Sequence, residues 1–372
     1  MKIVTIIGAR PQFIKTATVS RAIETFNNSV SNQSSRITEV IVHTKQHFDD
    51  NMSDLFFREM QIPAPAYCLD INCLGHSAMT GRMMEKIETI LLDEQPDLLL
   101  VYGDTNSTLA GALTAAKLHI PIAHVEAGVR SFNRSMPEEH NRVLTDHCSD
   151  LLLCPTQTAV DNLKREGIPN NDSRQKVTFV GDAMYDSILH YSGIADEKSC
   201  LLGNYGLKKD GYYLVTIHRP YNTDNGEKIH EIMNILTGLD LPVVFPIHPG
   251  TRKLMHKHGY LSGKTASNNI IAIDPVGYID MVSLEKNSKI ILTDSGGIQK
   301  EAYFLKVPCI TIRPETEWTE TVDSGWNVLS ELNAEEINRL VRHHNWPGSI
   351  TNGHFGDGNA SEHIVKEILA YN

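Results

Sequence analysis

A chain of 372 residues is longer than one hydrophobic core usually organises, so its length predicts two domains of roughly 150 to 200 residues each. Hydrophobic residues make up 41% and charged residues 21%, which is typical of a globular protein and excludes the disordered and fibrous classes. The formal net charge of −11 disfavours nucleic acid and anionic membrane surfaces as partners.

The six cysteines are scattered along the chain and show no metal-ligand spacing. We therefore expect reduced core cysteines and no metal site. No apolar run approaches the roughly 18 to 20 residues of a membrane span, and the chain begins directly with a strand-like run. These features predict a cytoplasmic protein.

In the first half of the chain, short β-branched runs alternate with longer amphipathic stretches. The predicted strands are residues 2–8, 39–43, 98–102, 120–125 and 151–154. The predicted helices include residues 13–26, 77–93, 107–118 and 138–147. Such βα repeats are typical of a parallel, doubly wound sheet.

The second half repeats this scheme, with predicted strands at residues 212–217, 243–247, 270–273, 290–293 and 309–312. The polar stretch 167–176 predicts a boundary between an N-terminal domain, residues 1–170, and a C-terminal domain, residues 171–357. The pattern of residues 358–372 predicts a final helix. This helix is expected to pack on one of the two domains, and the N-terminal domain is one of the two options. We expect an α/β fold of two facing Rossmann-like domains with the active site in the cleft between them.

The turn after the first strand, GARPQFIK at residues 8–15, carries two cations. It lacks the GxGxxG pattern but places Arg10 in the turn and Lys15 one helical turn onward. This arrangement suits a phosphate or a carboxylate. The alternative is a tight turn with two solvated cations.

Three acids follow predicted strands of the first half: Asp104 in YGDTNST, Glu126 in HVEAGVRS and Glu138 in MPEEHNR. Taken singly, each is best explained as a helix cap. Their expected convergence with Arg10 and Lys15 makes acid–base chemistry plausible, because a carbon acid needs a base within hydrogen-bond reach.

In the second half, the segment TDSGGIQKE follows an apolar run and precedes a helix. Its residues Ser295, Gly296 and Gly297 can present backbone N–H groups to a diphosphate, and Glu301 can accept ribose hydroxyls. The alternative is an ordinary glycine-rich turn.

Two histidines, His218 and His248, end predicted strands of the second half. A metal site is disfavoured because no further ligand stands at the right spacing, and a structural role is as good an explanation as a functional one. A protonated His218 beside a leaving diphosphate would stabilise the charge that develops there.

Together the motifs point to one family. GARPQFIK, VYGDTNSTLAG, HVEAGVRS, MPEEHNR, the HR after a strand, DPVGYIDM, TDSGGIQKEA and GDGNAS occur in one order along nearly the whole chain. With this set the chain resembles the non-hydrolysing UDP-N-acetylglucosamine 2-epimerase family, whose members have two Rossmann-like domains in the GT-B arrangement.

The resemblance implies a reaction and a set of site residues. The C2 proton is lost with anti elimination of UDP, and UDP re-adds to the glycal with protonation from the other face, without a cofactor. The implied proton-transfer residues are Asp104, Glu126 and Glu138, with His218 at the UDP. The implied substrate-binding residues are Arg10, Lys15, Arg142, His248, Ser295, Gly296, Gly297, Glu301 and Arg313.

The chain departs from the family pattern at three positions: Tyr221 replaces an acid, Trp318 an arginine, and Met281 a phenylalanine. The patterns GARPQFIK and TEW look closer to members that act on UDP-2,3-diacetamido-2,3-dideoxy-glucuronate. The substrate is therefore expected to be UDP-N-acetylglucosamine or this uronate.

Three other functions stay open: a GT-B glycosyltransferase, a hydrolysing 2-epimerase and a UDP-sugar-binding regulator. The family resemblance further implies a homodimer and a supply of amino sugar for surface polysaccharide biosynthesis.

Overall fold

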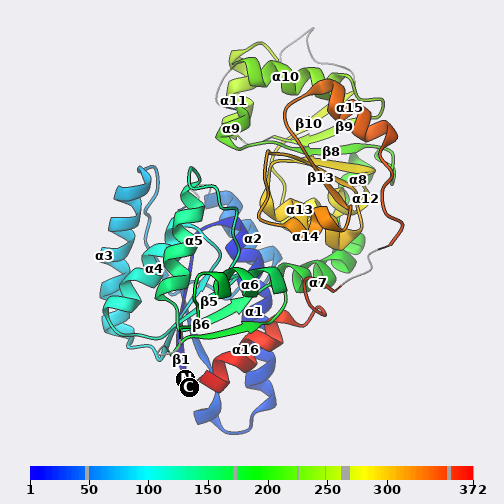
Figure 1. Ribbon diagram of the computed structural model, residues 1–372. Helices are drawn as coiled ribbons and strands as arrows, with labels where there is room; N and C mark the ends of the chain where they lie inside the picture. Colours follow the sequence, from blue (N-terminus) through cyan, green and yellow to red (C-terminus); the bar gives the residue numbers. More distant parts are fainter. Residues whose placement is uncertain are drawn as a thin grey trace. The chain divides into compact units, whose positions relative to one another are not determined.

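The computed structural model describes residues 1–46, 50–170, 174–223, 226–247, 249–260, 269–349 and 353–371. The chain forms two α/β units, each built on its own parallel sheet (Figure 1). The first unit comprises Met1–Ser187 and Gly353–Asn372, and the second comprises Ile188–Asn352. The predicted α/β fold with two doubly wound parallel sheets is confirmed.

The sheet of the first unit has seven parallel strands in the order β3-β2-β1-β4-β5-β6-β7. They are β1 Lys2–Ile7, β2 Thr38–His43, β3 Tyr67–Cys68, β4 Leu98–Tyr102, β5 Ile122–Val125, β6 Leu151–Cys154 and β7 Lys176–Phe179. The central strands are buried and mostly apolar because helices cover both faces of the sheet. The strand order reverses between β1 and β4, which is where parallel sheets of this kind bind ligands.

The helices of the first unit form two layers (Figure 1). In one layer, α3 His76–Glu94, α4 Asn106–Lys117 and α5 Pro137–Cys148 pack side by side. In the other, α1 Arg10–Ser29 packs against α2 Asp50–Glu59 and the C-terminal α16 Ala360–Tyr371. Helix α6 Gln157–Arg165 connects β6 to β7, and α7 Ala183–Lys198 runs from the first unit into the second.

The boundary between the units lies further along the chain than the sequence predicts. Strand β7, Lys176–Phe179, continues the first sheet, because it pairs in parallel with β6 from Leu151↔Lys176 to Cys154↔Phe179. The first unit therefore extends beyond residue 170 to Ser187. The final helix belongs to it as well, since Asp186 accepts hydrogen bonds from the backbone N–H groups of Ala360 and Ser361 at the start of α16.

The second unit has a six-stranded parallel sheet in the order β10-β9-β8-β11-β12-β13. The strands are β8 Tyr213–Thr216, β9 Val243–Pro246, β10 Ile270–Ile273, β11 Ile290–Thr293, β12 Cys309–Ile312 and β13 Asn327–Ser330. Its helices are α8 Leu201–Asn204, α9 Pro220–Thr223, α10 Gly226–Thr237, α11 Pro249–Lys257, α12 Tyr278–Asn287, α13 Gly296–Leu305, α14 Thr319–Asp323 and α15 Ala334–His343. The strand order reverses between β8 and β11. Among the described residues, no helix combines the length and the hydrophobicity that a membrane crossing needs.

Candidate active site

An acid and a lysine are paired at the carboxyl end of the first sheet. Glu126 directly follows β5, and its Oε1 lies 2.6 Å from Nζ of Lys15 on α1. Only 4% of the lysine side chain and 12% of the glutamate side chain are exposed. Glu126 adopts a φ of 73°, a left-handed conformation that few residues other than glycine take and that turns its side chain out of the strand.

The acid after the neighbouring strand is paired as well. Asp104 follows β4, and its Oδ2 forms an ion pair with Nη2 of Arg142 on α5. Nη1 of Arg142 lies 3.0 Å from Oε2 of Glu139, so one guanidinium group joins two carboxylates. Arg142, expected at the substrate from the family resemblance, pairs with Asp104 in the structure, and its substrate contact stays a prediction.

The two acids at the start of α5 differ in their surroundings. Glu139 is buried and accepts hydrogen bonds from Ser131 N, Ser131 Oγ and Phe132 N at 2.8–3.0 Å. The predicted Glu138 is half-buried, and its side chain makes no hydrogen bond or ion pair with any described residue. Glu139 thus anchors the preceding loop, whereas the Glu138 carboxylate does not.

The cationic turn after β1 is arranged differently from a simple phosphate loop. The backbone N–H groups of Gly8 and Ala9 donate to Oε1 of Gln12, at 2.7 and 3.1 Å. A side chain at position 8 has no room, because a Cβ there would lie 2.0 Å from Oγ1 of Thr44. These two backbone N–H groups therefore have an acceptor within the protein. The guanidinium carbon of Arg10 lies 5.0 Å from the ring centre of Phe56, and Arg10 is the cation of the turn itself.

In the second unit, a buried aspartate orients His218. Asp294, at the end of β11, accepts hydrogen bonds from the backbone N–H groups of His218 and Arg219 and from Nδ2 of Asn222. Its Oδ1 lies 3.3 Å from Nδ1 of His218, whose side chain is 46% exposed. The sequence analysis gave Asp294 no role, although its position as the acid between a buried strand and the Ser-Gly-Gly turn was a usable signal.

The Ser-Gly-Gly turn begins a ten-residue helix, α13. The first N–H groups of a helix have no acceptor within the helix, which makes its start an anion site. The backbone is close to another side chain there, because a Cβ at Gly296 would lie 2.5 Å from Oε1 of Glu317. Ser295 N donates to Oγ1 of Thr293 at 3.0 Å, and Glu301, one turn inside α13, is buried.

The predicted Arg313 and the departing residue Trp318 are both buried near α13. Nη2 of Arg313 lies 2.9 Å from Oε2 of Glu317, and both side chains are nearly inaccessible. Trp318, which replaces the family's arginine, packs its ring 3.8 Å from Nζ of Lys300. Arg313 is thus held by a carboxylate of the protein. The predicted His248 lies outside the described residues.

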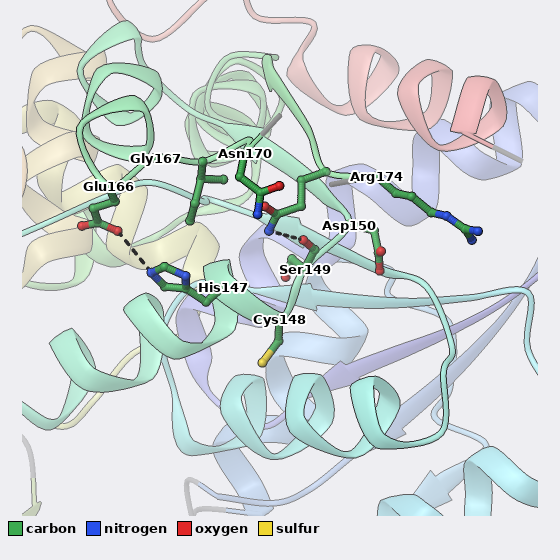
Figure 2. Close-up of a pocket in the computed structure, with 10 residues that line it drawn as sticks. His147, Cys148, Ser149, Asp150, Glu166, Gly167, Asn170 and Arg174 are labelled. Carbon is green, nitrogen blue, oxygen red and sulfur yellow. Dashed lines mark hydrogen bonds and ion pairs between the residues drawn. The ribbon is translucent and has the colours of Figure 1, made fainter. Parts of the chain in front are cut away.

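A separate hollow of about 470 Å³ opens at the other edge of the first sheet (Figure 2). Its lining comes from segments that precede β6 and β7, including His147, Ser149 and Arg174, together with Glu166 at the end of α6. Parallel strands place these segments at the amino ends of the sheet, away from Asp104 and Glu126. None of the predicted site residues lines this hollow.

Comparison with known proteins places this geometry in a family. The family model described as UDP-N-acetylglucosamine 2-epimerase matches residues 30–369. The chain belongs to this family. It is therefore an epimerase, an enzyme of the isomerase class, and the resemblance inferred from the motifs is confirmed.

Relatives of the chain are similar along its whole length. It is 50% identical over 369 residues to a UDP-N-acetylglucosamine 2-epimerase homolog of Methanococcus maripaludis, covering 99% of both chains. It is 47% identical over 372 residues to a UDP-2,3-diacetamido-2,3-dideoxy-D-glucuronate 2-epimerase of Pseudomonas aeruginosa, again covering 99% of both. The crystal structure of UDP-GlcNAc 2-epimerase from Methanocaldococcus jannaschii, in complex with UDP-GlcNAc and UDP, matches with a TM-score of 0.88 and 42% identity over 100% of each chain.

Proposed function

We propose that the protein inverts C2 of a UDP-linked N-acetylated amino sugar by anti elimination and re-addition of UDP. The observation that carries this proposal is the pair of acids at adjacent strand ends, Asp104 and Glu126, each held by a cation without being used as a helix cap. Inversion of a carbon acid needs proton-transfer groups for both faces of C2, and several carboxylates in one site meet that need.

The first unit would supply the proton transfer. Asp104, Glu126 and Glu138 are the candidate acids and bases, because their carboxylates lie at the carboxyl side of β4 and β5 or at the start of α5. Arg10 would bind an anionic part of the substrate. Lys15 and Arg142 would act through the carboxylates that they orient.

The second unit would hold the UDP. The start of α13, with Ser295, Gly296 and Gly297, suits the diphosphate, and Glu301 would accept the ribose hydroxyls. His218, oriented through Nδ1 by Asp294, would stabilise the charge on the leaving diphosphate.

Two substrates are supported by different observations. The archaeal relatives are named for UDP-N-acetylglucosamine, whereas the Pseudomonas relative, 47% identical, is named for UDP-2,3-diacetamido-2,3-dideoxy-D-glucuronate. The patterns GARPQFIK and TEW, the latter at residues 316–318, look closer to members that act on the uronate, and this favours the uronate as the second candidate.

The experiment supplies purified protein with each UDP-sugar separately and analyses the products by proton NMR and anion-exchange chromatography. The proposal predicts a UDP-linked manno epimer from at least one of the two. Free sugar as the main product would indicate a hydrolysing epimerase. Transfer of the sugar to an acceptor, with no epimer formed, would indicate a glycosyltransferase.

We further propose a cytoplasmic homodimer that supplies an activated amino sugar for polysaccharide biosynthesis. The family membership supports this proposal. Light scattering on the eluting protein tests the dimer, and a mass of one 41.5 kDa chain would contradict it.

A further inference from the structure

A fully buried histidine stands between the two acid-bearing loops of the first unit. His124 lies on β5, and its Nε2 is 2.7 Å from the carbonyl oxygen of Gly103, the residue before Asp104. Its Nδ1 is 2.7 Å from Oδ1 of Asp146 on α5. Neither the histidine nor the aspartate side chain has any exposed surface.

Asp146, the partner of the His124 ring at Nδ1, is itself held by two further donors. Oδ2 of Asp146 accepts from the Gly128 N–H at 3.1 Å and from Nη1 of Arg130 at 2.6 Å. Burial raises the pKa of Asp146, but the hydrogen bonds and charges of His124 and Arg130 outweigh it and bring the pKa below its usual value. A carbonyl oxygen and a charged carboxylate oxygen are both acceptors, so each ring nitrogen of His124 faces an acceptor.

This network reaches both loops that carry the acids. Gly103 directly precedes Asp104, and Gly128 lies two residues after Glu126. Gly103, Glu126 and Gly128 all have positive φ, at 62°, 73° and 78°. Backbone in this region is held by its surroundings rather than by its own preference, and the bonds from His124 and to Asp146 provide part of that support.

The outer end of the network is tied to α6. Nε and Nη2 of Arg130 donate to the two carboxylate oxygens of Glu166 at 2.8 and 2.7 Å. Glu166 is 27% exposed and lines the hollow at the amino ends of the sheet. Arg130 therefore joins the carboxylate of Glu166 to that of the buried Asp146, and Asp146 in turn contacts His124. Figure 2 shows Glu166 beside His147.

We infer that His124 is a positioning residue for the epimerisation: by holding the Gly103 carbonyl against β5, it fixes Asp104 relative to Glu126. The inference rests on the proposed proton-transfer roles of these two acids. His124 itself is buried and contacts no substrate, so it acts only through Gly103. A misplacement of about 1 Å in such a site lowers the rate by about 100-fold.

Two substitutions separate the two bonds of the ring. In His124→Asn the amide nitrogen replaces Nδ1, so the bond to Asp146 is kept and the bond to Gly103 is lost. In His124→Gln the amide nitrogen replaces Nε2, so the bond to Gly103 is kept and the bond to Asp146 is lost. Ile87→Ala, a core change on α3, serves as a control for lost stability alone.

Turnover per folded protein, the unfolding temperature and the dissociation constant of UDP are measured for all three variants and for the parent. We expect His124→Asn to lower kcat by about 100-fold at an unchanged UDP dissociation constant. His124→Gln should keep kcat close to that of the parent while lowering the unfolding temperature. If His124→Asn does not fold, His124→Gln and Glu166→Gln still test the inference, because both keep the bond to Gly103 and should therefore keep a kcat close to that of the parent.

Two results would overturn the inference: a parental kcat in His124→Asn, or losses of kcat in both histidine variants no larger than in Ile87→Ala at the same unfolding temperature. A loss of kcat in Glu166→Gln as large as the one expected for His124→Asn would also overturn it. A parent protein that forms no epimer from any UDP-sugar would instead overturn the proposed function, which keeps the two failures distinct.

Discussion

Nζ of Lys15 and Oε1 of Glu126 lie 2.6 Å apart at the carboxyl end of the first sheet, although the two residues come from α1 and from the end of β5. The lysine satisfies the charge of a carboxylate that is largely withdrawn from water. This contact keeps the Glu126 carboxylate at the carboxyl end of β5, where the proposed function needs a proton-transfer group.

Replacing Glu126 by glutamine removes a proton-transfer group while keeping its size. We expect kcat to fall by about 10² to 10⁴-fold, since the amide cannot take or give the proton. The dissociation constant of UDP, measured by titration calorimetry, should not change. An equal loss in UDP binding and in turnover would assign Glu126 to structure or to substrate binding.

Asp104 and Glu139 share Arg142, and this makes them a matched pair. Asp104→Asn should lower kcat by about 10² to 10⁴-fold with little change in the unfolding temperature. Glu139→Gln should lower the free energy of unfolding by about 1 to 3 kcal/mol, because buried donors of Ser131 and Phe132 lose a charged acceptor. Thermal unfolding and steady-state kinetics on both variants test this division. The reverse pattern, with Glu139→Gln folded normally but inactive, would contradict it.

Asp294 accepts several hydrogen bonds from the loop that carries His218. In Asp294→Asn one oxygen becomes a donor that faces other donors, so we expect a loss of about 1 to 3 kcal/mol in the free energy of unfolding. We also expect kcat to fall because His218 is no longer held. The comparison is with His218→Gln, which should lower kcat and leave the unfolding temperature nearly unchanged, since its side chain is 46% exposed. A fall of the unfolding temperature in His218→Gln as large as in Asp294→Asn would argue against the orienting role.

Glu39 on β2 gives a prediction for pH. Burial raises the pKa of its carboxyl, and the hydrogen bonds from Ser20 and Thr5, both 2.6 Å long, only partly offset this. A carboxyl with a raised folded-state pKa contributes stability below its unfolded value of 4.5 and loses it as the pH rises through the folded value. Glu39→Gln should therefore be more stable than the parent at pH 7 to 8, and this advantage should vanish toward pH 4.5. Thermal unfolding of both proteins across this pH range measures the stability difference between the variant and the parent. A difference that favours the variant less at pH 8 than at pH 4.5 would contradict the prediction.

Most strands of both sheets could be predicted because their apolar runs are short and bounded by turn residues. Strand β7, Lys176–Phe179, was not predicted, and for this reason the predicted domain boundary lies too early in the chain. The residues of β7 are exposed or only half-buried. An edge strand of this kind has a weak apolar signal, so the polar stretch before it resembled a linker. Its place in the first sheet depends on pairing with β6, a tertiary contact that the local sequence does not encode.

The candidate acids could be predicted because parallel strands bring their carboxyl ends to one edge of a sheet, which places Asp104 beside Glu126. The cations that pair with these acids could not be predicted. Arg142 and Lys15 were expected at the substrate, and only the packing of α5 and α1 shows that each holds an acid. The role of His124 was not predicted, although a polar residue inside the fully buried strand β5 indicates a specific hydrogen-bonding role.

The most direct test of the proposed chemistry is solvent deuterium incorporation. The protein is incubated in D₂O with UDP-GlcNAc and, separately, with UDP-2,3-diacetamido-2,3-dideoxy-glucuronate, and the sugars are followed by proton NMR. Proton abstraction at C2 predicts a UDP-linked epimer that carries deuterium at C2, with exchange appearing in the remaining substrate as the reaction proceeds. An epimer that retains its original hydrogen at C2 would contradict the proton-transfer account of Asp104, Glu126 and Glu138.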